Sequence, residues 1–195
     1  MLKTEGMDPK TLILERIRAI SQPEKPYPPV APEPGTLELV EAFEKMVRLS
    51  GSSWIRLNTE AAVIEYLQGL PDVAEWISTW PPLKGITRDP IAQGMDARQK
   101  IPGAILPGQL GVAENGAVWV AEEGMGWRAL PFLAEHLVLV LRPNDLVPHM
   151  HAAYARISPG DYGVFIAGPS KTADIEQHLV LGAQGPLAHT VIILG

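Results

Sequence analysis

Three short apolar runs in the C-terminal part of the chain constrain its fold more than any other feature. They cover residues 136–141, 162–167 and 189–194. Near-continuous apolar runs of this length are typical of strands that are buried on both faces. Helical segments are expected between them. Together they predict an α/β fold with a mostly parallel sheet and helices on both faces.

Apolar spacing and turn residues predict the remaining elements. Helices are expected over residues 9–20, 36–49, 59–70, 71–80, 129–134 and 145–157, and from Lys171 or Ala173 onward. Strands are expected over residues 53–57 and 83–87. Asn115-Gly116 predicts a hairpin turn within residues 112–120. Residues 89–109 are mixed in polarity and rich in Gly and Pro, which makes them a candidate for active-site loops or for a mobile segment.

A proline-rich segment divides the chain. Six of its nineteen prolines lie in residues 21–35, which predicts an extended linker. We therefore expect an N-terminal helix and linker over residues 1–35, followed by one α/β domain over residues 36–195.

Composition excludes several classes of function. The chain has no cysteine, so it cannot form disulfides or hold a thiolate-ligated iron–sulfur cluster. Its net charge of −6 argues against nucleic acid and anionic membranes as partners. No run approaches the roughly 20 apolar residues of a membrane span. We expect a cytoplasmic protein, and no motif indicates a cofactor or a metal.

A polar segment directly after the run over residues 162–167 is the main candidate site. It reads GPSKTADIE over residues 168–176. Ser170 and Thr172 supply hydroxyls, Lys171 an ammonium, and the expected helix a positive N-terminus, which together favour an anionic ligand. The alternative is structural: Ser170 or Thr172 caps the helix, and Asp174 complements its dipole.

Several motifs resemble the lactate-utilization protein C family, the LUD domain. They are Ala113-Glu114-Asn115-Gly116, His136 at the start of a strand, GPSKTADIE, and Gly182-x-x-Gly185-Pro186, within residues 111–194. The resemblance implies a fold like that of the NagB/RpiA/CoA-transferase group. It also implies a role in oxidising L-lactate to pyruvate beside two iron–sulfur proteins. Where the family usually has a histidine this chain has Gln184, and an amide does not titrate near neutral pH.

The leading hypothesis from this resemblance is an accessory component of lactate utilization without an iron–sulfur cluster. It would bind an anionic small molecule or dock on its redox partners. The ligand residues would be Gly168, Ser170, Lys171, Thr172, Asp174, Gln184 and Gly185.

Glu114 supports an alternative function. Ala-Glu-Asn-Gly is similar to a CoA-transferase motif in which the Glu is the acyl-accepting nucleophile. Such a site would need a second copy of a single domain, so a homodimer is one expectation. The structural alternative is that Glu114 only neighbours a hairpin turn. A third hypothesis is a binding module without chemistry, in which the first helix and linker dock on a partner.

The histidines indicate structure more than chemistry. His136 is expected to be a hydrogen-bonded strand residue. His149 and His151 should face different ways on a helix, so metal binding by both is not expected. Asp174 and His178 share a helix spacing that suits an ion pair.

Overall fold

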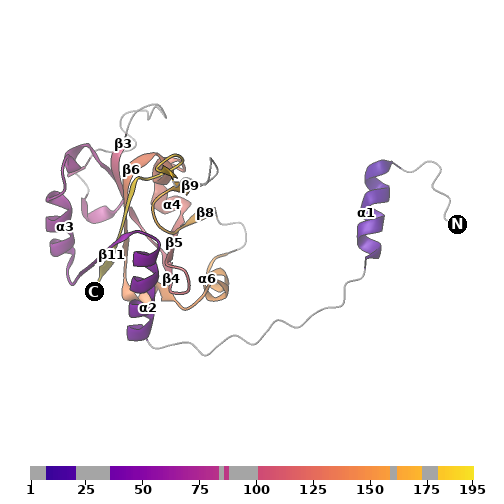
Figure 1. Cartoon of the computed structure of the whole chain (residues 1–195), viewed down its shortest axis with the longest axis horizontal. Coiled ribbons are helices and arrows are strands. Elements are labelled where there is room, and N and C mark those ends of the chain that lie inside the picture. Colours follow the sequence, from indigo (N-terminus) through magenta and orange to yellow (C-terminus); the bar gives the residue numbers. More distant parts are fainter. Residues whose placement is uncertain (1–7, 21–35, 84–85, 88–100, 159–161, 173–179) are drawn as a thin grey trace. The chain divides into compact units, whose positions relative to one another are not determined.

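The computed structural model of the chain describes residues 8–20, 36–83, 86–87, 101–158, 162–172 and 180–195 (Figure 1). The chain divides into two compact units, Met1–Pro32 and Glu33–Gly195. In the first, helix α1 (Pro9–Ala19) begins with a proline and carries Arg16 and Arg18 in its last turn, both favourable positions. The helix has no buried residue. Asp8 precedes it without capping it through its side chain.

A five-stranded parallel sheet forms the centre of the second unit. Its strand order is β1 (Ser53–Leu57), β11 (Ala188–Leu194), β6 (Ala134–Leu141), β3 (Ile101–Pro107) and β2 (Ile77–Ser78). Every neighbouring pair is parallel. The expected mostly parallel sheet is therefore confirmed, and two of the three apolar runs form its neighbouring strands β6 and β11.

The third apolar run belongs to a different sheet. β8 (Gly163–Ile166) lies at the edge of a four-stranded sheet in the order β7 (Leu146–Val147), β4 (Leu110–Val112), β5 (Ala117–Ala121) and β8. It pairs antiparallel with β5, so its expected place in the parallel sheet was wrong. The run identifies a strand, but pairing depends on distant residues that the run itself does not contain. The hairpin β4–β5 is confirmed.

Helices cover both faces of the parallel sheet. The apolar face of α2 (Thr36–Leu49) joins one core with Leu137, Leu139 and Val191. On the opposite face, α3 (Glu60–Gln68) buries Val63 and Leu67 in a second core. Thr59 caps α3, because its side-chain oxygen accepts a hydrogen bond from the Ala62 N–H. Two short helices, α4 (Glu122–Met125) and α5 (Leu130–Leu133), lie between β5 and β6.

Three expected elements have a different form. Residues 71–80 hold the 3-10 helix η1 (Val73–Glu75) and β2 instead of one helix, and η2 (Pro81–Leu83) stands where a strand was expected to begin. The helix expected from residue 145 is replaced by η3 (Pro143–Asp145), β7 and α6 (Met150–Arg156). Pro148 explains this break, because proline cannot donate the backbone hydrogen bond of a continuous helix.

β3 is the largest departure from expectation. It was assigned to loops, yet it lies between β6 and β2 and buries Ala104, Ile105 and Leu106 completely. Pro102 and Gly103 obscure its pattern. Gly103 is required there, because a Cβ atom would lie only 2.1 Å from Cδ2 of Trp76. Residues 88–100 lie outside the described part of the chain. Among the described helices, none is both long and apolar enough to cross a membrane.

Candidate functional site

The candidate anion-binding segment is a loop followed by a strand. Residues 168–170 follow β8 and lead into β9 (Lys171–Thr172), which pairs antiparallel with β10 (Val180–Leu181). The helix expected to begin at Lys171 is therefore wrong, because Lys171 and Thr172 pair with Leu181 and Val180 in extended conformation. Ala173, Asp174 and His178 lie outside the described residues. A helix beginning at Ala173 stays a prediction, and the described donors for an anion here are the Ser170 and Lys171 side chains.

Ser170 ties this segment to the second glycine-containing loop. Its backbone N–H donates to Pro186 O at 2.9 Å, and its carbonyl accepts from the Gly182 N–H at 3.0 Å. Its Oγ accepts a hydrogen bond from the Gln184 N–H at 3.4 Å. Accepting that bond does not use the hydroxyl's own proton, so Oγ keeps the capacity to donate to a ligand. The structure thus brings together three of the predicted ligand residues, Ser170, Gln184 and Gly185.

Lys171 rests on the turn that follows α2. Its exposed side chain donates from Nζ to Ser50 O at 2.5 Å. An ammonium has three N–H groups, and among the described residues one of them is used on Ser50 O, so the group can also donate to an anion. Gly168, at φ +84°, lies against the same carbonyl, since a Cβ there would be 2.5 Å from Ser50 O. The backbone at Ser50 therefore supports both ends of the loop over residues 168–171.

A buried polar chain continues from this turn into the sheet. Ser50 Oγ donates to Val47 O at 2.6 Å and lies 3.0 Å from Ser52 Oγ. Ser52 Oγ in turn lies 2.7 Å from Nδ1 of His189, a residue that is 2% exposed. Burial lowers the pKa of His189 to about 4, with a smaller contribution from the charge of His136.

Sequence reasoning missed these residues. Ser52 and His189 are separated by 137 positions, and neither lies in a recognisable motif.

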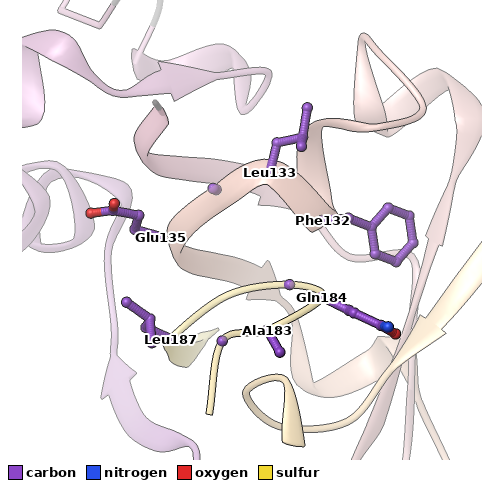
Figure 2. Close-up of a pocket in the computed structure, with 9 residues that line it drawn as sticks. Phe132, Leu133, Glu135, Ala183, Gln184 and Leu187 are labelled. Carbon is purple, nitrogen blue, oxygen red and sulfur yellow. The ribbon is translucent and has the colours of Figure 1, made fainter. Parts of the chain in front are cut away.

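A pocket of about 390 Å³ opens beside Gln184. One wall is the backbone of residues 182–185, and the other is formed by α5 and the start of β6 (Figure 2). Figure 2 shows the Gln184 amide and the Phe132 ring extending to one side, and Glu135 and Leu187 lying towards the other. Because Ser170 is hydrogen-bonded to Gly182 and Gln184, this pocket wall is attached directly to the Lys171 segment.

Glu114 has a structural partner. The exposed Glu114 follows β4, and its Oε2 accepts a hydrogen bond from the Met150 N–H at 3.0 Å. That N–H is one of the free donors at the start of α6. Asn115 Oδ1 accepts from the Ala117 N–H, and Gly116 has φ +71°. The motif therefore serves as a turn and as a helix cap.

The other predicted histidines also have partners within the protein. His136 Nε2 is 2.8 Å from Thr190 Oγ1. The His136 and Trp76 rings pack edge to face, with their centroids 5.1 Å apart. His136 is thus hydrogen-bonded, as expected. His149 precedes α6 instead of lying within it, and its Nδ1 accepts from the Ala152 N–H. Across the described residues, no group of three or more His, Asp or Glu side chains could hold a metal ion.

The parallel sheet, its covering helices and the attached four-stranded sheet define an α/β domain. Comparison with solved structures finds the same fold in a DUF162 family protein from Deinococcus radiodurans. That match has a TM-score of 0.58 and 14% identity, and covers 83% of this chain and 99% of the other. Residues 100–194 match the LUD domain family. This part of the chain is therefore similar to a LUD domain, and the resemblance to the lactate utilization protein C family is confirmed.

Curated relatives carry the corresponding name. Lactate utilization protein C of Geobacillus kaustophilus is 28% identical over 83% of this chain and 71% of its own length. The protein of the same name from Geobacillus thermodenitrificans is 30% identical over 52% of this chain and 46% of its own. Uncharacterized protein YkgG of Escherichia coli is 27% identical over 59% and 51%, respectively. The matches to the last two relatives thus span about half of their length.

Proposed function

We propose that this protein is an accessory component of L-lactate utilization without an iron–sulfur cluster. In this role, the segment over residues 168–172 and the loop over residues 182–185 bind an anionic small molecule. The names of the relatives support the metabolic context. The absence of cysteine leaves any thiolate-ligated cluster to other proteins.

One observation carries the ligand assignment: an exposed ammonium and a hydroxyl group lie on adjacent residues. Lys171 Nζ uses one donor on Ser50 O. Ser170 Oγ accepts from the Gln184 N–H, a bond that does not use the hydroxyl's own proton, so this group can donate to an external acceptor. A carboxylate or phosphate accepts hydrogen bonds from such donors, and charge-assisted bonds are about twice as strong as neutral ones. Lys171 and Ser170 hold the anion, and Gln184 and Gly185 border it.

Calorimetric titration with L-lactate and with inorganic phosphate tests this assignment. Lys171→Met removes the charge with a similar side-chain length, and we expect about tenfold weaker binding. Lys45→Met is the matched control, because Lys45 is an exposed lysine of α2 and its loss changes the net charge equally. If Lys171→Met, Lys45→Met and the unaltered protein bind these anions with equal affinity, the assignment of Lys171 as an anion-binding residue is wrong.

A growth experiment tests the metabolic role. In the source organism, replacement of the gene by a Ser170→Ala, Thr172→Val double variant should impair growth on L-lactate but leave growth on glucose unchanged. Thr172 is included because it is the second residue of the short strand β9 and adjoins Lys171 in the sequence. Urea unfolding of the purified variant confirms that it is folded. Normal growth on lactate with a stable double variant contradicts the proposal.

Iron–sulfur proteins of lactate utilization are the proposed partners. Affinity capture of the tagged protein from its own cells, followed by mass spectrometry, should recover cysteine-rich redox proteins. A variant lacking residues 1–35 tests whether α1 takes part, since Ile13 and Ile17 are 57% and 59% exposed on it. Recovery of the chain alone, or only with its own copies, contradicts the partner assignment.

A further inference from the structure

A one-way hydrogen-bond chain sets the protonation of His189. Ser50 has one hydroxyl proton and donates it to the carbonyl of Val47. Ser52 must therefore be the donor in the bond between the two serine hydroxyls. With its own proton used in this way, Ser52 can only accept from the imidazole of His189. The chain thus places a proton on Nδ1 of His189, and the burial of the ring, which lowers its pKa, favours the neutral form.

The chain ends beneath the proposed anion site. Ser50 contributes its hydroxyl to the buried chain and its backbone carbonyl to Lys171 Nζ. Ser52 N–H also donates to Val47 O at 3.2 Å, so the turn between α2 and β1 is held at both serines. Its orientation therefore depends on His189, which reaches it from the neighbouring strand β11.

We propose that His189 is a positioning residue for the anion site. Through Ser52 and Ser50 it fixes the carbonyl that holds the Lys171 ammonium. This inference rests on the proposed function, because it concerns the affinity of the same site. His189 itself does not touch the ligand in this arrangement. Its Nε2 is buried and has no hydrogen-bond partner among the described residues, so within them the connection to the site runs through Nδ1.

Two substitutions at His189 separate positioning from simple packing. An asparagine N–H lies at about the same distance from the backbone as Nδ1–H, so His189→Asn keeps the donor to Ser52. His189→Leu removes it and preserves an apolar volume. We expect about tenfold weaker binding of L-lactate or phosphate for His189→Leu. His189→Asn should bind within about twofold of the unaltered protein. Equal losses in both variants, with folding intact, would overturn the proposal.

Ser52→Ala provides a second route if the leucine variant fails to fold. It removes one oxygen from the middle of the chain and should weaken binding to a similar extent. A Ser52→Ala variant that binds as tightly as the unaltered protein also overturns the proposal. Nitrogen-15 NMR of the histidines gives an independent measurement, with a protonated Nδ1 and an unprotonated Nε2 expected for His189. The opposite tautomer contradicts the one-way chain.

A double-mutant cycle with Lys171→Met completes the test. If His189 acts through Lys171, His189→Leu should weaken binding by less than about twofold once Lys171 is methionine. If His189→Leu still weakens binding tenfold in the Lys171→Met background, His189 does not act through Lys171. The positioning role is then wrong, while the proposed anion site stands. If Lys171→Met itself has no effect on binding, the proposed function fails as well. The two failures are therefore distinguishable.

Discussion

Replacement of Gly168 by alanine tests how tightly the candidate loop is built. Gly168 has φ +84°, where an L-residue such as alanine is strained by about 1 kcal/mol. Its new Cβ would lie 2.5 Å from Ser50 O, whereas a comfortable carbon–oxygen contact is about 3.3 Å. The loop or the turn must therefore move by about 0.8 Å. Overpacking of this kind costs about 1–3 kcal/mol.

The expected total is a loss of about 2–4 kcal/mol in the free energy of unfolding. Urea denaturation followed by tryptophan fluorescence measures it, and calorimetry measures the affinity for L-lactate in parallel. Because Ser50 O also holds Lys171, binding should weaken together with stability. Gly124→Ala is the control, since its Cβ would meet Pro107 O at 3.3 Å with an ordinary φ.

Gly168→Asn divides the effect into its two causes. Asparagine tolerates positive φ better than alanine but carries the same Cβ. We expect it to recover part of the backbone strain and none of the contact with Ser50 O. A Gly168→Ala loss below about 1 kcal/mol would refute the reasoning. So would full stability of Gly168→Asn, because it would mean that the contact costs nothing.

Three further predictions concern the core, the turn and acid stability. Gly103→Ala should cost about 3 kcal/mol by displacing Trp76. The same change in a Trp76→Ala background should cost less than about 1 kcal/mol in urea denaturation. Glu114→Ala should cost about 1 kcal/mol through the lost cap on α6, with Glu114→Gln near normal. Intact mass after incubation with acyl-CoA should show no adduct, and an adduct that Glu114→Gln abolishes would support acyl transfer instead. The pKa of His189 is about 4 in the folded protein and about 6.5 in the unfolded chain. The contribution of the neutral ring to the free energy of unfolding is therefore complete above about pH 6.5 and is lost as the pH falls from about 6.5 towards 4. Between pH 7 and pH 4 the unaltered protein should lose about 3 kcal/mol more stability than His189→Asn, and parallel curves in urea would contradict this.

Local patterns predicted the elements whose signal lies within their own residues. β6 and β11 are continuous apolar runs, and the β4–β5 turn contains Asn115-Gly116. β3 was missed because Pro102 and Gly103 interrupt its apolar pattern, although Gly103 is needed to admit Trp76 from another part of the chain. Sequence alone cannot reveal that need, since the two residues meet only in the folded sheet.

The site was predictable to the extent that its motif was recognisable. Gly168, Ser170 and Lys171 with Gln184 and Gly185 follow from the family resemblance, and the structure brings them together. The supporting turn at Ser50 and Ser52 and the buried His189 have no local signal. Serines are common at helix ends, and a histidine at the start of a strand is ordinary. Their pairing is a tertiary contact, which pattern reasoning on one sequence does not detect.

The strand order has a consequence for how this domain is made. β11 lies between β1 and β6, although it follows every other described strand along the chain. During synthesis, β1 and the edge of β6 that faces it therefore cannot pair with their neighbour until β11 has left the ribosome. Both carry unpaired edges and apolar faces in that interval, which favours association with other nascent chains. A messenger truncated shortly before residue 188 would thus yield an aggregating product instead of a smaller working domain.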